Sequence, residues 1–203
     1  MQMTNQKWNT RIFIIIAIFS ALPYLIEAQS SWEPLIIDQQ QFQKRAMMVL
    51  GGWGMVNVVS GGIGMATTEG ATKYFHQMNL GWGAINTGLA ITGYLGARSF
   101  DLDAPLGMSL LDKNLGMGKA FLFNTGLDVG YVMGGLYLRE RARRSENPDR
   151  LRGFGNSIML QGSFLFGFDL IAYFVNNSKT ERIKDMIIAV GSTSDGVGLS
   201  IQF

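Results

Sequence analysis

Two aspartates stand out because the sequence around them is otherwise uncharged. Asp128 and Asp169 are the only charged residues within four long apolar windows of the chain. A charged side chain costs roughly 2.5–3.5 kcal/mol at the centre of a bilayer, and residues of this kind often have a function there. No lysine or arginine lies in any window to pair with them. Two interpretations follow: neutral acids that donate hydrogen bonds inside the fold, or groups that carry protons or bind a cation.

Three asparagines, Asn57, Asn86 and Asn124, lie near the middle of these windows. The first two end a repeated sequence, GWGMVN and GWGAIN. The spacing of four residues places Trp53 with Asn57, and Trp82 with Asn86, on one helix face. An amide in apolar surroundings needs a hydrogen-bond partner. We therefore expect these side chains to join neighbouring helices, with the lining of a polar conduit as the alternative.

The composition excludes several chemistries. The chain has no cysteine, so it has no thiolate nucleophile, disulfide or cysteine metal site. Its single histidine, His76, lies beside Tyr74 and Phe75, as in an interfacial aromatic belt. A net charge of +2 provides no basic surface for nucleic acid. The sequence contains no Walker, HExxH or GxSxG motif. We expect no cofactor and no metal, and the sequence favours a non-enzymatic protein.

Four apolar helices must position these residues. The windows cover residues 46–66, 77–97, 120–138 and 153–175. A helix needs about 20 residues to cross a hydrocarbon core about 30 Å thick. We therefore predict an all-α membrane protein, with a four-helix transmembrane bundle over residues 29–178. The alternative is a soluble helical bundle with a large core.

The N-terminus and the arginines predict an orientation. Lys7 and Arg11 precede the apolar run 12–26, which is typical of a signal peptide or an uncleaved signal anchor over residues 1–28. Residue 29 then lies outside the cytoplasm. The arginine-rich loop 139–152 lies inside, as short basic loops do. We interpret this loop as a topology signal, with binding of anionic lipid headgroups as the alternative. The predicted location is the inner membrane with a periplasmic C-terminal tail; the alternative is association with the outer membrane.

The glycines predict close helix packing. Nineteen of the 26 glycines fall in the four windows. Gly126, Gly130 and Gly134 recur every four residues and form a ridge of small residues on one face. Such a ridge indicates an interface, either within the chain or with another chain. The expected partners are the lipid bilayer and a homo-oligomer or larger membrane complex, and nucleic acid is not expected.

The C-terminal segment, residues 179–203, changes its periodicity. The apolar run 186–190 is followed by a glycine-containing loop and by alternating apolar and polar residues over 197–203. This pattern predicts a short β-hairpin. One hairpin cannot close an outer-membrane barrel, so we expect a small periplasmic cap or an edge for a partner strand.

Together, the signal-like start, GWGxxN on two spans, the basic loop and a hairpin ending in Phe203 resemble an uncharacterised family of small helical membrane proteins of Bacteroidota. The resemblance extends over most of residues 30–203 and implies no activity or site residues. The predicted function is a non-enzymatic structural or accessory subunit that packs through glycine-rich helices. The alternative is a small transporter, or a proton- or cation-conducting component, that uses the aspartates and asparagines of the spans.

Overall fold

The computed structural model describes the backbone of residues 3–98 and 106–191, and the side chains of residues 32–98 and 107–188. The chain divides into two units, Met1–Asp38 and Gln39–Phe203. The elements, in chain order, are α1 (Met3–Thr67), α2 (Gly70–Leu95), η1 (Gly96–Arg98), α3 (Leu106–Arg141), η2 (Ala142–Arg144) and α4 (Pro148–Gly191). No strand occurs in the described residues, so the prediction of an all-α fold is confirmed.

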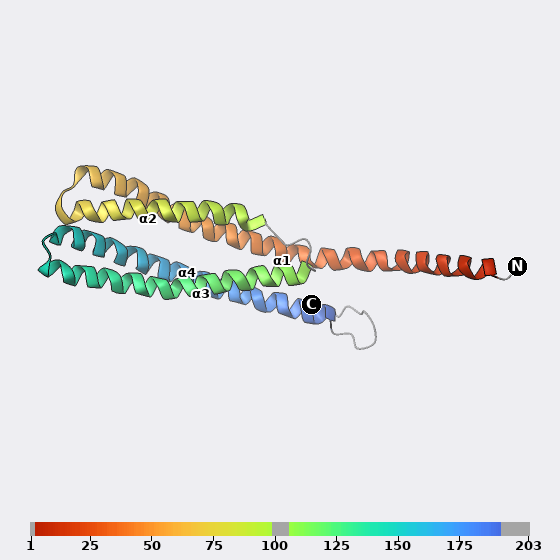
Figure 1. Cartoon of the computed structure of the whole chain (residues 1–203). Coiled ribbons are helices and arrows are strands. Elements are labelled where there is room, and N and C mark those ends of the chain that lie inside the picture. Colours follow the sequence, from red (N-terminus) through yellow and green to blue (C-terminus); the bar gives the residue numbers. More distant parts are fainter. Residues whose placement is uncertain (1–2, 99–105, 192–203) are drawn as a thin grey trace. The chain divides into compact units, whose positions relative to one another are not determined.

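In the second unit the helices form two antiparallel hairpins, α1 with α2 and α3 with α4 (Figure 1). The turn between α1 and α2 is tight because Gly70 adopts a φ of +55°, which costs little only for glycine. Pro148 begins α4, where a missing backbone N–H is tolerated. The ammonium group of Lys113 on α3 donates hydrogen bonds to the carbonyl oxygens of Gly96 and Ala97 in η1, which follows α2.

Three of the predicted spans lie within one helix each, whereas the window 77–97 runs from α2 into η1. The helices α1, α3 and α4 extend well beyond their windows. The C-terminal β-hairpin is not supported: its first strand, residues 186–190, is part of α4, and residues 192–203 lie outside the described residues. The physical reason is that the buried positions after the last window keep helical spacing. Asn176, Thr180 and Ile183 are all buried on one face of α4. A signal peptide over residues 1–28 stays a prediction.

The second unit buries many polar side chains and exposes many large apolar ones, beside a small apolar core that contains Leu50, Ala90 and Leu165. Seven of its nine largest fully buried side chains are polar. These are Gln39, Gln161, Asn86, Asn114, Asn176, Asp128 and Ser157. Large apolar side chains are exposed on all four helices, among them Ile63 (62%), Leu95 (71%), Phe123 (67%) and Ile171 (66%). This distribution is the reverse of that expected for a protein folded in water.

Two of the described helices are long and apolar enough to cross a membrane. The qualifying stretches are Trp32–Thr67 of α1 and Pro148–Ile188 of α4. Length and composition alone do not separate such helices from the core helices of soluble proteins, and a signal sequence near the N-terminus passes the same test. Two of the four predicted spans, 46–66 and 153–175, therefore have weak support from the structure.

Candidate functional site

The two aspartates of the spans lie against each other between α3 and α4. Asp128 is 2% exposed and Asp169 is 5% exposed. Their carboxyl groups are within hydrogen-bonding reach of each other, and Asp169 also hydrogen-bonds the Asn124 side chain. Two carboxylates in contact repel strongly when both are ionised, so such a pair is stable when it shares a proton. Chemically, the pair can hold and release one proton.

Three buried polar atoms near the depth of this pair have no hydrogen-bond partner among the described residues: Oδ2 of Asp128, Nδ2 of Asn86 and Oγ1 of Thr87. The rings of Trp82 on α2 and Tyr131 on α3 are in contact, with centroids 5.0 Å apart. These helices run antiparallel. Asn86, about one turn further along α2, therefore lies at the level of Asp128, about one turn back along α3. The unbonded acceptor and donor are thus at similar depth in the bundle.

A first amide cluster joins three helices around Gln161 of α4. The Gln161 side chain accepts a hydrogen bond from the Trp53 indole N–H (2.8 Å). Its Nε2 donates to Oδ1 of Asn57 (2.8 Å) and to Oδ1 of Asn79 (3.0 Å). Asn79 also accepts from the Ser157 hydroxyl. Gln161 therefore links α4 to both α1 and α2 through three side chains.

A second amide cluster joins α1, α3 and α4 around Asn114. Asn114 Nδ2 donates to Oε1 of Gln39 (2.8 Å), and Asn176 Nδ2 donates to the backbone oxygen of Asn114 (2.9 Å). The Thr180 hydroxyl donates to Oδ1 of Asn114. Gln39 Nε2 donates to Oδ1 of Asn176 (3.3 Å). The side chains thus pair with one another, as buried amides must.

Apolar layers separate these polar groups along α4. Glycines aside, the buried residues of this helix are, in order, Ser157, Gln161, Leu165, Asp169, Ala172, Asn176, Thr180 and Ile183. Leu165 therefore lies between the first cluster and the aspartate pair, and Ala172 lies between the pair and the second cluster. At 1.5 Å per residue, Asp169 is about 12 Å along the axis from Gln161 and about 10 Å from Asn176.

Glycines allow the backbones of each hairpin to approach closely. A Cβ on Gly83 would lie 2.6 Å from the carbonyl oxygen of Gly54, and a Cβ on Gly54 would lie 2.9 Å from the carbonyl oxygen of Gly83. Gly135 and Gly155 make the same reciprocal contact between α3 and α4, at 2.6 and 2.7 Å. A side chain at any of these positions would push the paired helices apart.

The predicted ridge of Gly126, Gly130 and Gly134 makes no such close contact between the described helices. A Cβ at any of the three would meet no atom within 4 Å in the described structure. All three glycines are exposed on α3. Their role in helix packing stays a prediction, and within this chain the close contacts of α3 are made by Gly135 instead.

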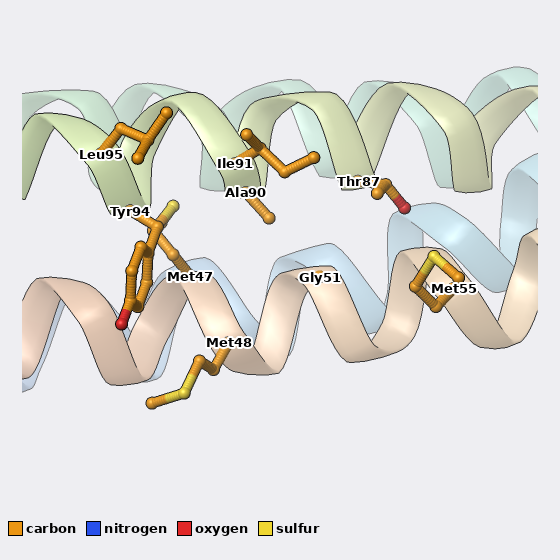
Figure 2. Close-up of a pocket in the computed structure, with 9 residues that line it drawn as sticks. All are labelled: Met47, Met48, Gly51, Met55, Thr87, Ala90, Ile91, Tyr94 and Leu95. Atoms are coloured by element: carbon orange, nitrogen blue, oxygen red, sulfur yellow. The ribbon is translucent and has the colours of Figure 1, made fainter.

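An apolar groove runs between α1 and α2 (Figure 2). Its volume is about 390 Å³. Met47, Gly51 and Met55 of α1 line one side, and Ala90 and Tyr94 are among the residues of α2 on the other. The lining contains no carboxylate, histidine, lysine or arginine, and its polar side chains are the hydroxyls of Thr87 and Tyr94. The mostly apolar lining therefore suits a hydrocarbon group.

The sequence-predicted residues are thus only partly brought together. Asp128, Asp169 and Asn124 are adjacent, Asn86 lies at their depth, and Asn57 belongs to the separate cluster around Gln161. The sequence reasoning missed the other members of both clusters. Gln161 and Asn79 lie in the apolar windows, so a search for any amide there would have found them. Gln39, Asn114 and Asn176 lie outside the windows, where polar residues carry no such signal.

His76 packs against α1, where its ring fills the space beside Gly64. Within the described residues, no group of three or more histidine, cysteine, aspartate or glutamate side chains could hold a metal ion. The sites described above therefore consist of one acid pair and two amide clusters.

Comparison with known proteins gives a family without an assigned function. No curated protein and no solved structure matches the chain. A family of unknown function matches residues 49–170, which include most of α1 after Asp38, all of α2 and α3, and more than half of α4 within the second unit. The resemblance to an uncharacterised family is confirmed, and the chain belongs to the family of unknown function DUF6992.

Proposed function

We propose that this protein is a multi-pass membrane protein with a non-enzymatic structural or accessory role. The observation that carries the proposal is the reversed distribution of side chains, with amides and acids inside and large apolar residues outside. In water, that arrangement would lose the hydrophobic driving force for folding. In a bilayer it is favourable, because exposed apolar residues contact lipid and buried amides hydrogen-bond between helices.

The use of the polar side chains supports a structural role. Most amides of the two clusters bond one another, so they join helices and are not held ready for a ligand. The apolar groove of Figure 2 is lined by no carboxylate, histidine, lysine or arginine. A scaffold needs only this: a bundle held in one register and an outer surface that can meet a partner.

The exposed glycine ridge supports a partner outside the chain. Gly126, Gly130 and Gly134 leave room for a second backbone to approach α3 closely. A homo-oligomer or a larger membrane complex is the partner this proposal requires. We further propose the inner membrane of a Gram-negative cell, of the Bacteroidota type expected from the sequence, with the loop between α3 and α4 in the cytoplasm.

Cysteine labelling tests the membrane location and the orientation together. The chain has no cysteine, so single replacements at Ser145, which precedes α4, and at Ser178, which lies within α4, report on opposite sides of the predicted span 153–175. We expect the protein to stay in membranes washed with alkaline carbonate. In intact spheroplasts, an impermeant maleimide should label position 178 and leave position 145 unlabelled. Release by carbonate would favour the soluble bundle. Labelling of position 145 alone would mean that the orientation is opposite to the proposed one.

A proton- or cation-conducting component is the second candidate, favoured by the buried Asp128–Asp169 pair and its unbonded Oδ2 atom. Reconstituted liposomes with a pH-sensitive or cation-sensitive dye would test it. Conduction requires a flux in wild type that Asp128→Asn and Asp169→Asn remove and that Asn177→Asp, on an exposed face of α4, leaves intact. A wild type without flux supports the structural role.

A further inference from the structure

We propose that a cluster of arginines between the adjoining ends of α3 and α4 binds the phosphate of an anionic phospholipid. This inference rests on the proposed membrane location. It concerns a pocket of about 400 Å³ that is separate from the polar interior. The pocket is lined by Leu136, Arg139, Glu140, Arg143, Arg152 and Asn156.

The pocket has a net positive charge. Three guanidinium groups line it, and Glu140 is the one acid among the lining residues. Arg143 and Glu140 form an ion pair of 3.3 Å, but their side chains are 72% and 64% exposed. Such an exposed pair is weak and leaves most N–H donors of Arg143 available. The planar guanidinium group binds phosphate oxygens in a bidentate manner, so three of them suit a phosphate.

The helix pair positions Arg139 across the pocket. A Cβ on Gly155 would lie 3.0 Å from Cγ of Arg139, so the lack of a side chain at Gly155 lets the arginine lie against α4. The Arg139 Nη1 atom is 3.9 Å from the sulfur of Met159. Arg152, in the first turns of α4, approaches from the opposite helix. The pocket is therefore built by both helices and by the glycine contact that holds them together.

The surface next to the pocket favours a lipid over free phosphate. On α3, Leu136 lines the pocket, and Met133 and Val129 follow at helical spacing; all three are exposed. On α4, the exposed Leu160 lies one turn beyond Asn156. Acyl chains could lie along this apolar strip while the phosphate binds the arginines. Basic pockets between helices at a cytoplasmic membrane surface bind lipid headgroups in this way.

Native mass spectrometry of the full chain in mild detergent tests the proposal. Phosphatidylglycerol would be titrated, with phosphatidylcholine of identical acyl chains as the zwitterionic probe. We expect one phosphatidylglycerol to bind in preference to phosphatidylcholine. The triple variant Arg139→Gln, Arg143→Gln, Arg152→Gln should weaken that binding by more than about tenfold. These side chains are exposed, so the helix content measured by circular dichroism should not change.

A matched control separates the pocket from general charge. Arg141, Arg144 and Arg150 lie in the same region and outside the pocket, so their replacement by glutamine removes the same charge. The control triple should keep the affinity of wild type. An equal loss in both triples would overturn the proposal. Glu140→Gln, which removes the acid from the pocket, should strengthen binding, and an unchanged or weaker affinity would count against a phosphate in this position.

Inorganic phosphate is the remaining arm of the experiment. Millimolar phosphate should compete only weakly with phosphatidylglycerol, because it lacks the acyl chains. If phosphate displaces the lipid fully, or binds equally well alone, the lipid assignment is wrong. Carbonate extraction distinguishes a failure of the lipid-binding inference from a failure of the proposed membrane location. A protein that stays in the membrane but shows no difference between the triples refutes this inference alone, whereas an extractable protein refutes the proposed membrane location.

Discussion

Replacing Gln161 with leucine should destabilise the bundle more than its change in volume would suggest. Gln161 is 0% exposed and makes hydrogen bonds to Trp53, Asn57 and Asn79. Leucine is of similar size, so packing is nearly kept while the three bonds are lost. Interhelical bonds in membrane proteins average about 0.6 kcal/mol each, so the expected loss is about 2 kcal/mol. The loss should exceed this value if the Trp53 N–H, left without a partner, stays buried.

Unfolding of the purified protein in mixed micelles, followed by circular dichroism and tryptophan emission, measures this loss. Gln77→Leu on the exposed face of α2 is the matched control and should change the free energy of unfolding by less than about 0.5 kcal/mol. If Gln161→Leu and Gln77→Leu differ by less than about 0.5 kcal/mol, the reasoning that amide bonds hold the helices together is refuted.

A double-mutant cycle isolates one of the three bonds. Trp53→Phe removes the indole N–H but keeps an aromatic ring in the stack with Phe164, whose centroid lies 4.0 Å from that of Trp53. We expect Trp53→Phe and Gln161→Leu to be coupled by about 0.5–1.5 kcal/mol, because each removes one half of the same bond. Additive effects would mean that the bond contributes nothing to stability.

Three further predictions follow from the glycines and from Lys113. Gly54→Ala should destabilise, because its Cβ would lie 2.9 Å from the Gly83 carbonyl oxygen, whereas Gly52→Ala, with nothing within 4 Å, should stabilise by about 0.5–1 kcal/mol in thermal unfolding. Replacing Gly126, Gly130 and Gly134 with leucine should abolish self-association in cross-linking while leaving the thermal midpoint largely unchanged. The control is Gly116→Leu, on the same helix, where a Cβ would also meet no atom within 4 Å. Equal self-association in both variants would contradict the proposed interface. Burial lowers the pKa of Lys113 below its ordinary value of 10.5, so the unfolded chain binds this proton more tightly. The free energy of unfolding should then rise with pH between the folded-state pKa and 10.5, and Lys113→Met should remove that rise.

The sequence predicts the helices well because charge-free windows of about 20 residues leave little alternative to an apolar helix. It does not predict where α3 and α4 end. Their extensions carry charged residues on one face, and the buried face includes the polar residues Asn114, Asn176 and Thr180. A polar stripe at helical spacing looks like a solvated surface until a partner helix supplies its hydrogen bonds. Residues 186–190 resemble a strand for a different reason, because a short apolar run does not by itself distinguish a strand from a helix.

The candidate site was also predicted only in part from the sequence. The cost of burying a charge singled out Asp128 and Asp169, and the structure brings them together. The asparagine repeat was a weaker guide, because Asn57 and Asn86 end the same sequence but have different surroundings: Asn57 bonds Gln161, while Nδ2 of Asn86 has no partner in the described structure. Repetition in sequence reports a shared helix face, and it cannot report what the opposite helix carries.

The spacing of polar layers bears on the choice between a scaffold and a conduit. A proton path through the bundle would need continuous polar groups or water, yet Leu165 and Ala172 occupy the buried face of α4 on either side of Asp169. The rings of Phe164 and Phe168, 6.3 Å apart, add apolar bulk at the same level. Separate polar layers are instead suited to fixing register. If α4 slid by one turn, Gln161 would move to the level of Leu165 and lose partners on two helices, at a cost of about 2 kcal/mol from that cluster alone. Shifts of Asn176 would add to this penalty, so the layered amides favour one alignment of the four helices, which is the property that a structural subunit requires.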